Sequence, residues 1–363
     1  MKNVLLVAPT SNITGITTWT NRFLQNFKSD SFKLISIDSA PNRTNAYSES
    51  VVRRMIDGLL CTFSVVREVK KTSRATKIDI LHLTTTGSLG TFRDFLLARI
   101  CKNRGIKTIM ICHYGNIPNV LKNKKILSFF LLKTMKLFDH IWVGDKKTFD
   151  ALNSTQMLEN KVFVVPNGMV VEPLENIHAK NYTNVAFIGN LIESKGIFEL
   201  IKAINQISYN IHLQIVGGGN EKIIKQIKLL AGENLDKKIF FHGKKNNAEA
   251  VEFMKNIDIL ALPTYFPNEA FPLSILEAMS LGKLVISTRR AAIEDMLTAE
   301  DGSQCGIFVD EKSVEQLKNA IVFAYKNSKK ADELCKKAYK KVYECYRTEV
   351  VYDLYAELYK KMF

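Results

Sequence analysis

Two glutamates in the second half of the chain have the types, spacing and surroundings of residues that bind a polar ligand. Glu269 lies in a segment rich in proline and aromatic residues, and Glu277 lies eight residues later in an apolar run. Because proline favours the first turn of a helix, Pro272 predicts that a helix starts there, with Glu269 on the loop before it. A carboxylate one turn into a helix, such as Glu277, can bind the vicinal hydroxyls of a ribose. Its apolar neighbours disfavour a position on the open surface.

A lysine loop and a glycine run follow two predicted strands in the same half. Lys195 stands beside Gly196 between a strand and a helix, where its ammonium group could contact a diphosphate. A solvated surface lysine would have the same spacing. Gly217 and Gly218 belong to a run of three glycines after the next strand, and they could admit a nucleotide or form a flexible turn.

The first half offers a glycine loop and a histidine. Gly15 follows the first predicted strand at the start of a helix, where backbone amides and the helix dipole favour an anion. The full Gly-x-Gly-x-x-Gly pattern is absent, so an ordinary turn explains this loop equally well. His113 follows an apolar strand, and a lone histidine in that setting is more often structural than catalytic.

Short β-branched apolar runs alternate with helical patterns along the chain, which predicts βαβ units and parallel sheets. The first series of predicted strands is Val4–Ala8, Leu34–Ile37, Ile80–Leu83, Thr108–Cys112, Ile141–Val143 and Val162–Val165. The second series is Val185–Ile188, Leu213–Val216, Ile239–Phe241, Ile259–Leu262 and Leu284–Ile286. The candidate residues lie in the loops after these strands, at the edge where open parallel sheets bind ligands.

The turn Pro166-Asn167-Gly168 separates the two series and predicts a domain boundary. We expect an N-terminal Rossmann-like domain at residues 1–168 and a linker at residues 169–184. A second Rossmann-like domain is expected at residues 185–340. Residues 341–363 are expected to form a helical segment that could return to the N-terminal domain.

The stretch NEAFPLSILEAMSLGKLVIST resembles the carboxylate-pair motif of retaining family-four glycosyltransferases, whose common form is EGFGLPxLEAMAxGxPVI. The resemblance extends over nearly the whole chain. VFVVPNGMV looks like the interdomain turn, VAFIGNLIESKGIFELIKAI like the lysine loop, and AAIEDM with GIFVD like the end of the second domain. These enzymes, the glycosyl transferases group 1, have the GT-B fold. The resemblance therefore implies an α/β protein of two Rossmann-like, doubly wound domains that face a central cleft. It also implies that residues 1–168 form the acceptor-side domain and residues 185–340 the nucleotide-sugar-binding domain.

The resemblance also implies roles for individual residues. Glu269 would contact the donor sugar as a catalytic residue, Glu277 would hold the ribose hydroxyls, and Lys195 would neutralise the diphosphate. His113 would reach the transferred sugar as a second catalytic residue when the domains close. The other residues expected to bind the donor are Gly15, Asn190, Gly217, Gly218, Ala270, Phe271, Pro272 and Leu273.

Three departures from the family pattern concern donor binding. Asn190 stands where many relatives have an arginine beside the diphosphate, so the positive charge there would rest on Lys195 alone. Ala270 replaces the usual glycine, and Pro272 removes an amide N–H that could have met the donor.

The resemblance implies transfer of a sugar from a nucleotide sugar with retention at the anomeric carbon, and we expect the donor to be UDP-linked rather than GDP-linked. An Asp-x-Asp motif is missing, so we expect neither a metal nor another cofactor, and the nucleotide sugar is a substrate. The expected acceptor is a saccharide or a lipid-linked saccharide in cell-surface polysaccharide synthesis. A non-catalytic glycosyltransferase-like binding subunit and a GT-B sugar-nucleotide epimerase are the alternatives.

Charge is concentrated in the first half of the chain. Residues up to Gly168 hold 25 Lys and Arg against 11 Asp and Glu, a balance of +14, whereas the remainder holds 26 against 25. Such a field attracts anionic partners, although a merely lysine-rich soluble surface is the alternative. No basic motif interleaved with aromatic residues is present, so nucleic acid is not an expected partner.

A basic, apolar segment suggests how the first half could meet an anionic membrane surface. Residues 119–138 combine Lys122, Lys124 and Lys125 with many apolar residues, which suits a helix lying in an interface, or else a core helix with a solvated basic edge. Six scattered cysteines suit a reducing compartment. The chain shows no signal-peptide pattern and no apolar run long enough to cross a bilayer. We therefore expect a cytoplasmic protein, peripheral at the inner face of the cell membrane.

Overall fold

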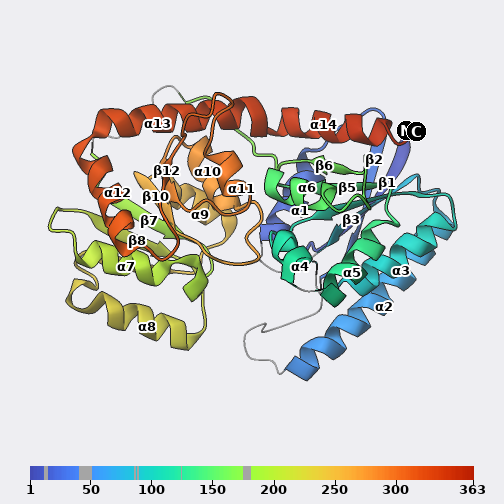
Figure 1. The fold of residues 1–363 in the computed structure, drawn as a ribbon, viewed down its shortest axis with the longest axis horizontal. Coiled ribbons are helices and arrows are strands. Elements are labelled where there is room, and N and C mark those ends of the chain that lie inside the picture. The colour runs from blue at the N-terminus through green and yellow to red at the C-terminus, as the bar shows by residue number, and fades with distance from the viewer. Residues whose placement is uncertain (12–14, 41–50, 86, 88–89, 124, 175–180) are drawn as a thin grey trace. The chain divides into compact units, whose positions relative to one another are not determined.

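The structure, a computed structural model, describes residues 1–363 except 12–14, 41–50, 86, 88–89, 124 and 175–180. The chain divides into two compact units (Figure 1). The first unit comprises Met1–Gly168 and Thr348–Phe363, and the second comprises Met169–Arg347. The last helix of the chain thus belongs to the first unit.

The first unit is built on a parallel six-stranded sheet in the order β2-β1-β3-β4-β5-β6. Its strands are β1 (Lys2–Ala8), β2 (Phe32–Asp38), β3 (Ile80–Thr85), β4 (Lys107–Cys112), β5 (His140–Val143) and β6 (Val162–Val164). The strand runs consist largely of buried β-branched and leucine residues, as expected for a sheet that is covered on both faces.

Helices cover the two faces of this sheet unequally. One face carries α2 (Val51–Ala75), α3 (Gly90–Lys102), α4 (Ile117–Asn123), α5 (Lys125–Met135) and α6 (Lys146–Asn153), whose apolar residues share a core with alternate strand residues. The other face carries α1 (Gly15–Asn26) and α14 (Thr348–Lys360). Right-handed crossovers produce this division, because the chain moves one way along the sheet from β1 to β2 and the other way afterwards.

A cluster of aromatic side chains holds α14 on the sheet. The ring of Trp142 on β5 lies 4.8 Å from that of Tyr355 and 5.5 Å from that of Tyr359. His82 on β3 is fully buried, and its Nδ1 lies 2.6 Å from the hydroxyl oxygen of Tyr359. On α1, the ring of Phe23 lies 5.2 Å from that of Tyr355. Rings therefore join the C-terminal helix to strands and to a helix from the start of the chain.

The second unit contains another parallel six-stranded sheet, in the order β12-β11-β10-β7-β8-β9. Its strands are β7 (Asn184–Ile188), β8 (His212–Val216), β9 (Ile239–Gly243), β10 (Ile259–Leu262), β11 (Leu284–Ser287) and β12 (Ile307–Phe308). Its α-helices are α7 (Ile197–Asn205), α8 (Glu221–Ala231), α9 (Asn247–Met254), α10 (Leu273–Ser280), α11 (Ala292–Met296), α12 (Val314–Lys326) and α13 (Ser328–Lys341). Short helical turns lie at η1 (Glu193–Lys195) and η2 (Gly232–Asn234), and a π-helical turn, η3 (Val342–Tyr346), extends α13.

The sequence predicted all of these strands except β12, which has only two residues. So short a strand has no periodicity that a sequence pattern could reveal. Helices α4 and α5 occupy most of the predicted basic segment at residues 119–138, with α4 packed on α6 and α5 packed on α3. Lys124, which lies between them, is outside the described residues.

Candidate functional site

The first candidate residues of the second unit lie at the point where the strand order of its sheet reverses. The chain proceeds from β7 to β8 and β9 on one side, and then returns to β10 on the other side of β7. The loops after β7 and β10 therefore diverge at their strand ends, and ligands of doubly wound sheets bind at such points. Lys195 follows β7 and Glu269 follows β10.

Lys195 and Glu269 form an ion pair at this switch point. The ammonium nitrogen of Lys195 lies 2.5 Å from Oε2 of Glu269, and the two side chains are only 15% and 7% exposed. The hydroxyl of Thr264, a fully buried residue just after β10, donates to the same Oε2 at 3.0 Å. The Lys195 ammonium also lies 5.4 Å from the ring centre of Phe266. A cation and a carboxylate are thus held together in a sheltered position.

Glycines allow the loops to approach one another closely. Gly196 has a φ of +79°, and a Cβ there would lie 2.2 Å from the carbonyl oxygen of Pro263 in the β10 loop. A Cβ on Gly217 would lie 2.0 Å from the carbonyl oxygen of Gly189 in the β7 loop. Neither position can accept a larger residue without a backbone shift. Gly218 is less restricted, since a Cβ at this position would meet only the Lys244 side chain, at 3.3 Å.

Arg290 fixes the loop that carries Glu269. Its Nε donates to the carbonyl oxygen of Phe266 and a terminal nitrogen donates to that of Tyr265, both at 3.0 Å. The guanidinium group is also 3.2 Å from a carboxylate oxygen of Glu311. No sequence motif pointed to Arg290 or to Thr264, although the position of Thr264 directly after a strand could have suggested it.

Glu277 lies on α10, one turn after the start of that helix at Leu273, as the sequence predicted. Its side chain is 3% exposed, and its Oε1 accepts a hydrogen bond from the Asn247 amide at 2.9 Å. Asn247 begins α9, so this bond joins the loop after β9 to the helix after β10. A buried carboxylate with such a neighbour can accept further hydrogen bonds from hydroxyl groups.

The remaining donor-site candidates surround these groups. Asn190 is exposed in the β7 loop. The carbonyl oxygen of Ala270 accepts from the amide of Ala292 at 3.1 Å. Phe271 and Pro272 are buried, and Leu273 is partly buried at the start of α10. The structure therefore brings Lys195 and Glu269 into contact, and places Glu277 in a separate network with Asn247.

In the first unit, the corresponding switch point lies between β1 and β3. Gly15 begins α1 after β1, and a Cβ there would meet no atom of the described residues within 4 Å, so these residues do not require a glycine. At the last residue of β3, the hydroxyl of Thr85 donates to the buried carboxylate of Asp94 at 2.5 Å, and Arg93 pairs with the other oxygen at 2.9 Å. Burial raises the pKa of Asp94, while Arg93 and Thr85 act in the opposite direction.

His113 lies directly after β4, with its ring 4.4 Å from that of Trp19. Burial lowers the pKa of His113 to about 4, so the imidazole is neutral at physiological pH. Its Nε2 is buried and has no hydrogen-bond partner among the residues that the structure describes. Burial lowers the pKa of the neighbouring His82 further, to about 3.

Of the three lysines predicted to contact a membrane or acceptor, Lys122 is exposed at the end of α4. Lys124 lies outside the described residues, and so does the side chain of Lys125. Within α5, Leu131 and Met135 are buried, whereas Ile126 and Phe129 are 88% and 59% exposed. This helix therefore packs in the core and also exposes an apolar edge.

Neither a metal cluster nor a membrane-spanning helix is found in the described part of the chain. No group of three or more His, Cys, Asp or Glu residues there could hold a metal ion. No described helix is long and apolar enough to cross a bilayer.

The part of the chain that contains Lys195, Glu269 and Glu277 is similar to known proteins. Residues 172–341 match the family described as glycosyl transferases group 1. The second unit therefore resembles the glycosyl transferases of group 1. The matched residues fall within the second unit, which contains the ion pair at the β7 and β10 loops.

Two curated relatives extend the likeness beyond this unit. An uncharacterized glycosyltransferase of Methanocaldococcus jannaschii is 26% identical over 85% of this chain and 84% of its own length. The N,N'-diacetylbacillosaminyl-diphospho-undecaprenol alpha-1,3-N-acetylgalactosaminyltransferase of Campylobacter jejuni is 24% identical over 52% of this chain and 47% of its own length.

Solved structures show the fold of the whole chain. Sucrose-phosphate synthase from Thermosynechococcus elongatus matches with a TM-score of 0.80 and 15% identity, over 100% of this chain and 99% of that chain. HepE from Anabaena, in complex with UDP-glucose, matches with a TM-score of 0.74 and 14% identity, over 99% and 100%. The fold is GT-B, as the sequence predicted, with one Rossmann-like domain in each unit.

Proposed function

We propose that this protein is a group 1 glycosyltransferase, which transfers a sugar from a UDP-sugar, with retention and without a metal, to a saccharide or lipid-linked saccharide. The observation that carries the proposal is the Lys195–Glu269 ion pair at the switch point of the second sheet, held by Thr264. A diphosphate needs a cation and a sugar hydroxyl needs an acceptor, and this pair supplies both within one sheltered position.

In the proposed reaction, the bond between the anomeric carbon and the diphosphate oxygen breaks, and the nucleoside diphosphate leaves with the bonding electrons. The acceptor hydroxyl forms the new bond to the anomeric carbon, and its proton passes to the departing diphosphate. Lys195 would move from Glu269 to the departing diphosphate and stabilise its negative charge. Glu269, still bonded to Thr264, would then accept hydrogen bonds from the sugar, while Glu277 would bind the ribose.

The proposed donor and acceptor are supported by different relatives. HepE, which has the same fold, was solved with UDP-glucose, and this favours a UDP-sugar as donor. The Campylobacter jejuni relative is named for an acceptor on diphospho-undecaprenol, which favours a lipid-linked saccharide made for cell-surface polysaccharide. The neutral imidazole of His113 would contribute to sugar binding as a hydrogen-bonding group rather than as a cation, because burial lowers its pKa.

Nucleotide release from a panel of UDP- and GDP-sugars, with and without EDTA, tests this proposal. We expect release from at least one UDP-sugar, stimulated by a lipid-linked saccharide acceptor and unchanged by EDTA. The anomeric configuration of the product, measured by NMR before it can isomerise, tests retention. Tight UDP binding without turnover would instead identify a binding subunit, and conversion of the free sugar nucleotide to its epimer would identify an epimerase.

A further inference from the structure

The helix α2 exposes a row of apolar side chains. Ile56, Leu59, Leu60 and Phe63 are 52%, 50%, 63% and 61% exposed. Their spacing of three and four residues places them on one face of the helix. Four large apolar residues exposed together on one face form a patch of the kind that marks a site of interaction.

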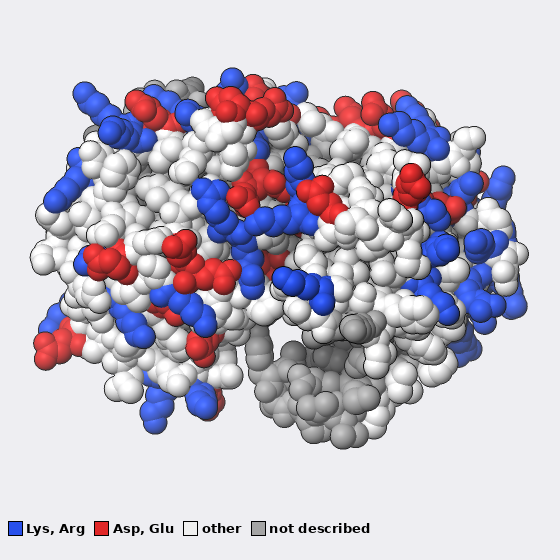
Figure 2. Space-filling view, viewed as in Figure 1, with Lys and Arg blue, Asp and Glu red and all other residues white. Residues whose placement is uncertain are grey.

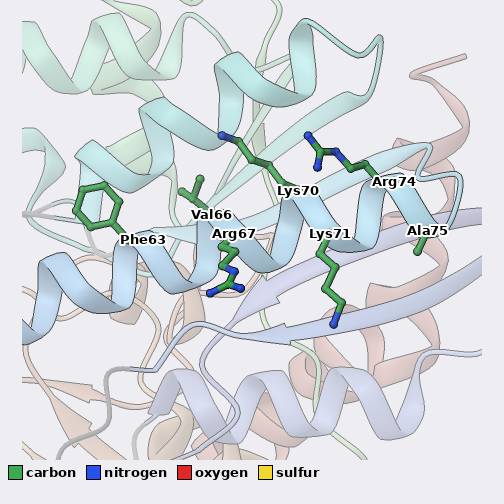
Figure 3. A pocket seen from close by; sticks show the side chains of 7 residues that line it. All are labelled: Phe63, Val66, Arg67, Lys70, Lys71, Arg74 and Ala75. Atoms are coloured by element: carbon green, nitrogen blue, oxygen red, sulfur yellow. The ribbon is translucent and has the colours of Figure 1, made fainter.

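Basic side chains continue the same face toward the end of the helix. Arg67, Lys70 and Arg74 follow Phe63 at helical spacing, and Lys71 lies beside them; all four are exposed. They line a surface hollow together with Phe63, Val66 and Ala75 (Figure 3). Figure 3 shows Lys70 and Arg74 projecting to one side of α2, and Arg67 and Lys71 projecting to the other. We refer to this face of α2, from Ile56 to Arg74, as the α2 stripe.

The opposite face of α2 fixes the orientation of the stripe. Val65 and Val69 are buried in the core beneath the sheet of the first unit. Rotation of the helix to cover the stripe would expose these valines, so the apolar row cannot be buried within the unit without a loss of core packing. The exposure is therefore a property of the folded unit.

The charges of the stripe indicate its partner. Among the described residues, no ion pair involves the four basic residues that follow Phe63. Figure 2 shows basic side chains gathered over the part of the first unit where Figure 1 places α2 and α3, with few acidic ones among them. A second copy of this chain would oppose like charges across the stripe, which disfavours self-association through it.

We propose that the α2 stripe binds the surface of a bilayer that contains anionic phospholipids. The apolar row would enter the boundary between headgroups and acyl chains, and the basic residues would contact lipid phosphates, as amphipathic interfacial helices do. The exposed apolar edge of α5, at Ile126 and Phe129, lies on a helix that packs beside α3 in the same layer and would add to this contact. This inference concerns membrane binding and does not depend on the proposed transfer reaction.

The basic end of the stripe is remote from the loops that bind donors in this fold. A crossover helix runs antiparallel to its strands, so the end of α2 lies near the start of β3 at Ile80, opposite to the carboxyl ends of the strands. Substitutions at Lys70 and Arg74 are therefore expected to leave nucleotide binding unchanged.

Co-sedimentation of the full chain with vesicles tests the proposal. Vesicles of phosphatidylcholine alone and of phosphatidylcholine with phosphatidylglycerol are compared at low and high salt, and the parent should bind the anionic ones in a salt-sensitive manner. Each basic residue near an anionic surface contributes about fivefold to binding, so Lys70→Glu with Arg74→Glu should weaken it by at least about 25-fold. Phe63→Ser should weaken it by roughly tenfold through lost apolar insertion.

Matched substitutions on the second unit provide the control. Lys222→Glu with Lys225→Glu makes the same change in net charge on the exposed face of α8, and Leu229→Ser removes an apolar residue that is 82% exposed. These variants should bind vesicles like the parent, and thermal melts should show that every variant folds. Equal losses in both sets of variants, or no loss from the α2 variants, would overturn the proposal. So would concentration-dependent dimers that Phe63→Ser abolishes, because a second copy would then cover the stripe.

Discussion

The two units share a fold but differ in how their polar and apolar groups are used. In the second unit, acidic and basic residues are nearly balanced, and the key carboxylates are buried and paired: Glu269 with Lys195 and Thr264, and Glu277 with Asn247. In the first unit, basic residues predominate, and α2 exposes apolar and cationic side chains together. The candidate ligand-binding groups of the second unit therefore make a few close, buried contacts, whereas those of the first unit are spread over an exposed surface.

This difference explains why recognition from sequence succeeded in one unit more than in the other. A site made of close contacts constrains residue types at fixed spacing, as at Gly196 and Gly217, where backbone atoms leave no room for a side chain. A surface that attracts an anionic partner needs only charge and exposed area, which many sequences supply. The family match accordingly falls within the second unit.

Removal of the charge on Glu269 should have the largest effect on activity. Glu269→Gln keeps the shape of the side chain but removes the charge that pairs with Lys195, and we expect turnover to fall by roughly 10²–10³. Nucleotide affinity should change little, because the ribose is assigned to Glu277. Steady-state kinetics and calorimetry measure the two effects separately. Glu193→Gln, on the exposed surface of the same lysine loop, is the matched control, and equal activity of both variants would refute the role of the pair.

Glu277→Ala should have the next largest effect, on nucleotide binding. Ribose hydroxyls that lose hydrogen bonds to a charged group forfeit ~1.5–3 kcal/mol, which is about 10- to 150-fold in affinity. Asn247→Ala leaves the carboxylate in place and should reduce nucleotide affinity less. Calorimetry with UDP, accompanied by a thermal melt, distinguishes lost binding from lost folding. Unchanged UDP affinity in Glu277→Ala would show that the buried carboxylate serves the fold alone.

A decrease in pH should destabilise the first unit. Burial lowers the pKa of His82 to about 3, well below its value of about 6.5 in an unfolded chain. Between these values the unfolded state binds a proton that the folded state does not, so stability falls as pH decreases from about 6.5. From pH 7 to pH 5, His82 alone should lower the free energy of unfolding by about 2 kcal/mol.

Denaturant unfolding of the parent and of His82→Phe at these two pH values measures this cost. Between these pH values, the free energy of unfolding of the variant should fall by roughly 2 kcal/mol less than that of the parent. The remaining pH dependence should include a contribution from His113, whose pKa is also lowered. Amide hydrogen exchange should show the loss in the first unit. An identical pH dependence in both proteins would contradict a neutral, buried His82.

Much of the fold could be predicted from the sequence because strand periodicity is a local property. Eleven strands were recognised from short β-branched runs, and the start of α10 after Pro272 was recognised from proline alone. The strand β12 was missed, because a strand of two residues has no periodicity that a sequence pattern could reveal.

By itself, the sequence determined two parallel α/β series, their division after Gly168, and the candidates Lys195, Glu269 and Glu277. Tertiary structure decided that Lys195 and Glu269 touch, that Thr264 and Arg290 hold their loops, and that the chain returns to the first unit through the tyrosines of α14. It also decided that the apolar row of α2 faces outward rather than into the core. The physical reason is the same in each case: periodicity and turn chemistry act between near neighbours, whereas these contacts join residues that only the order of strands in a sheet brings together.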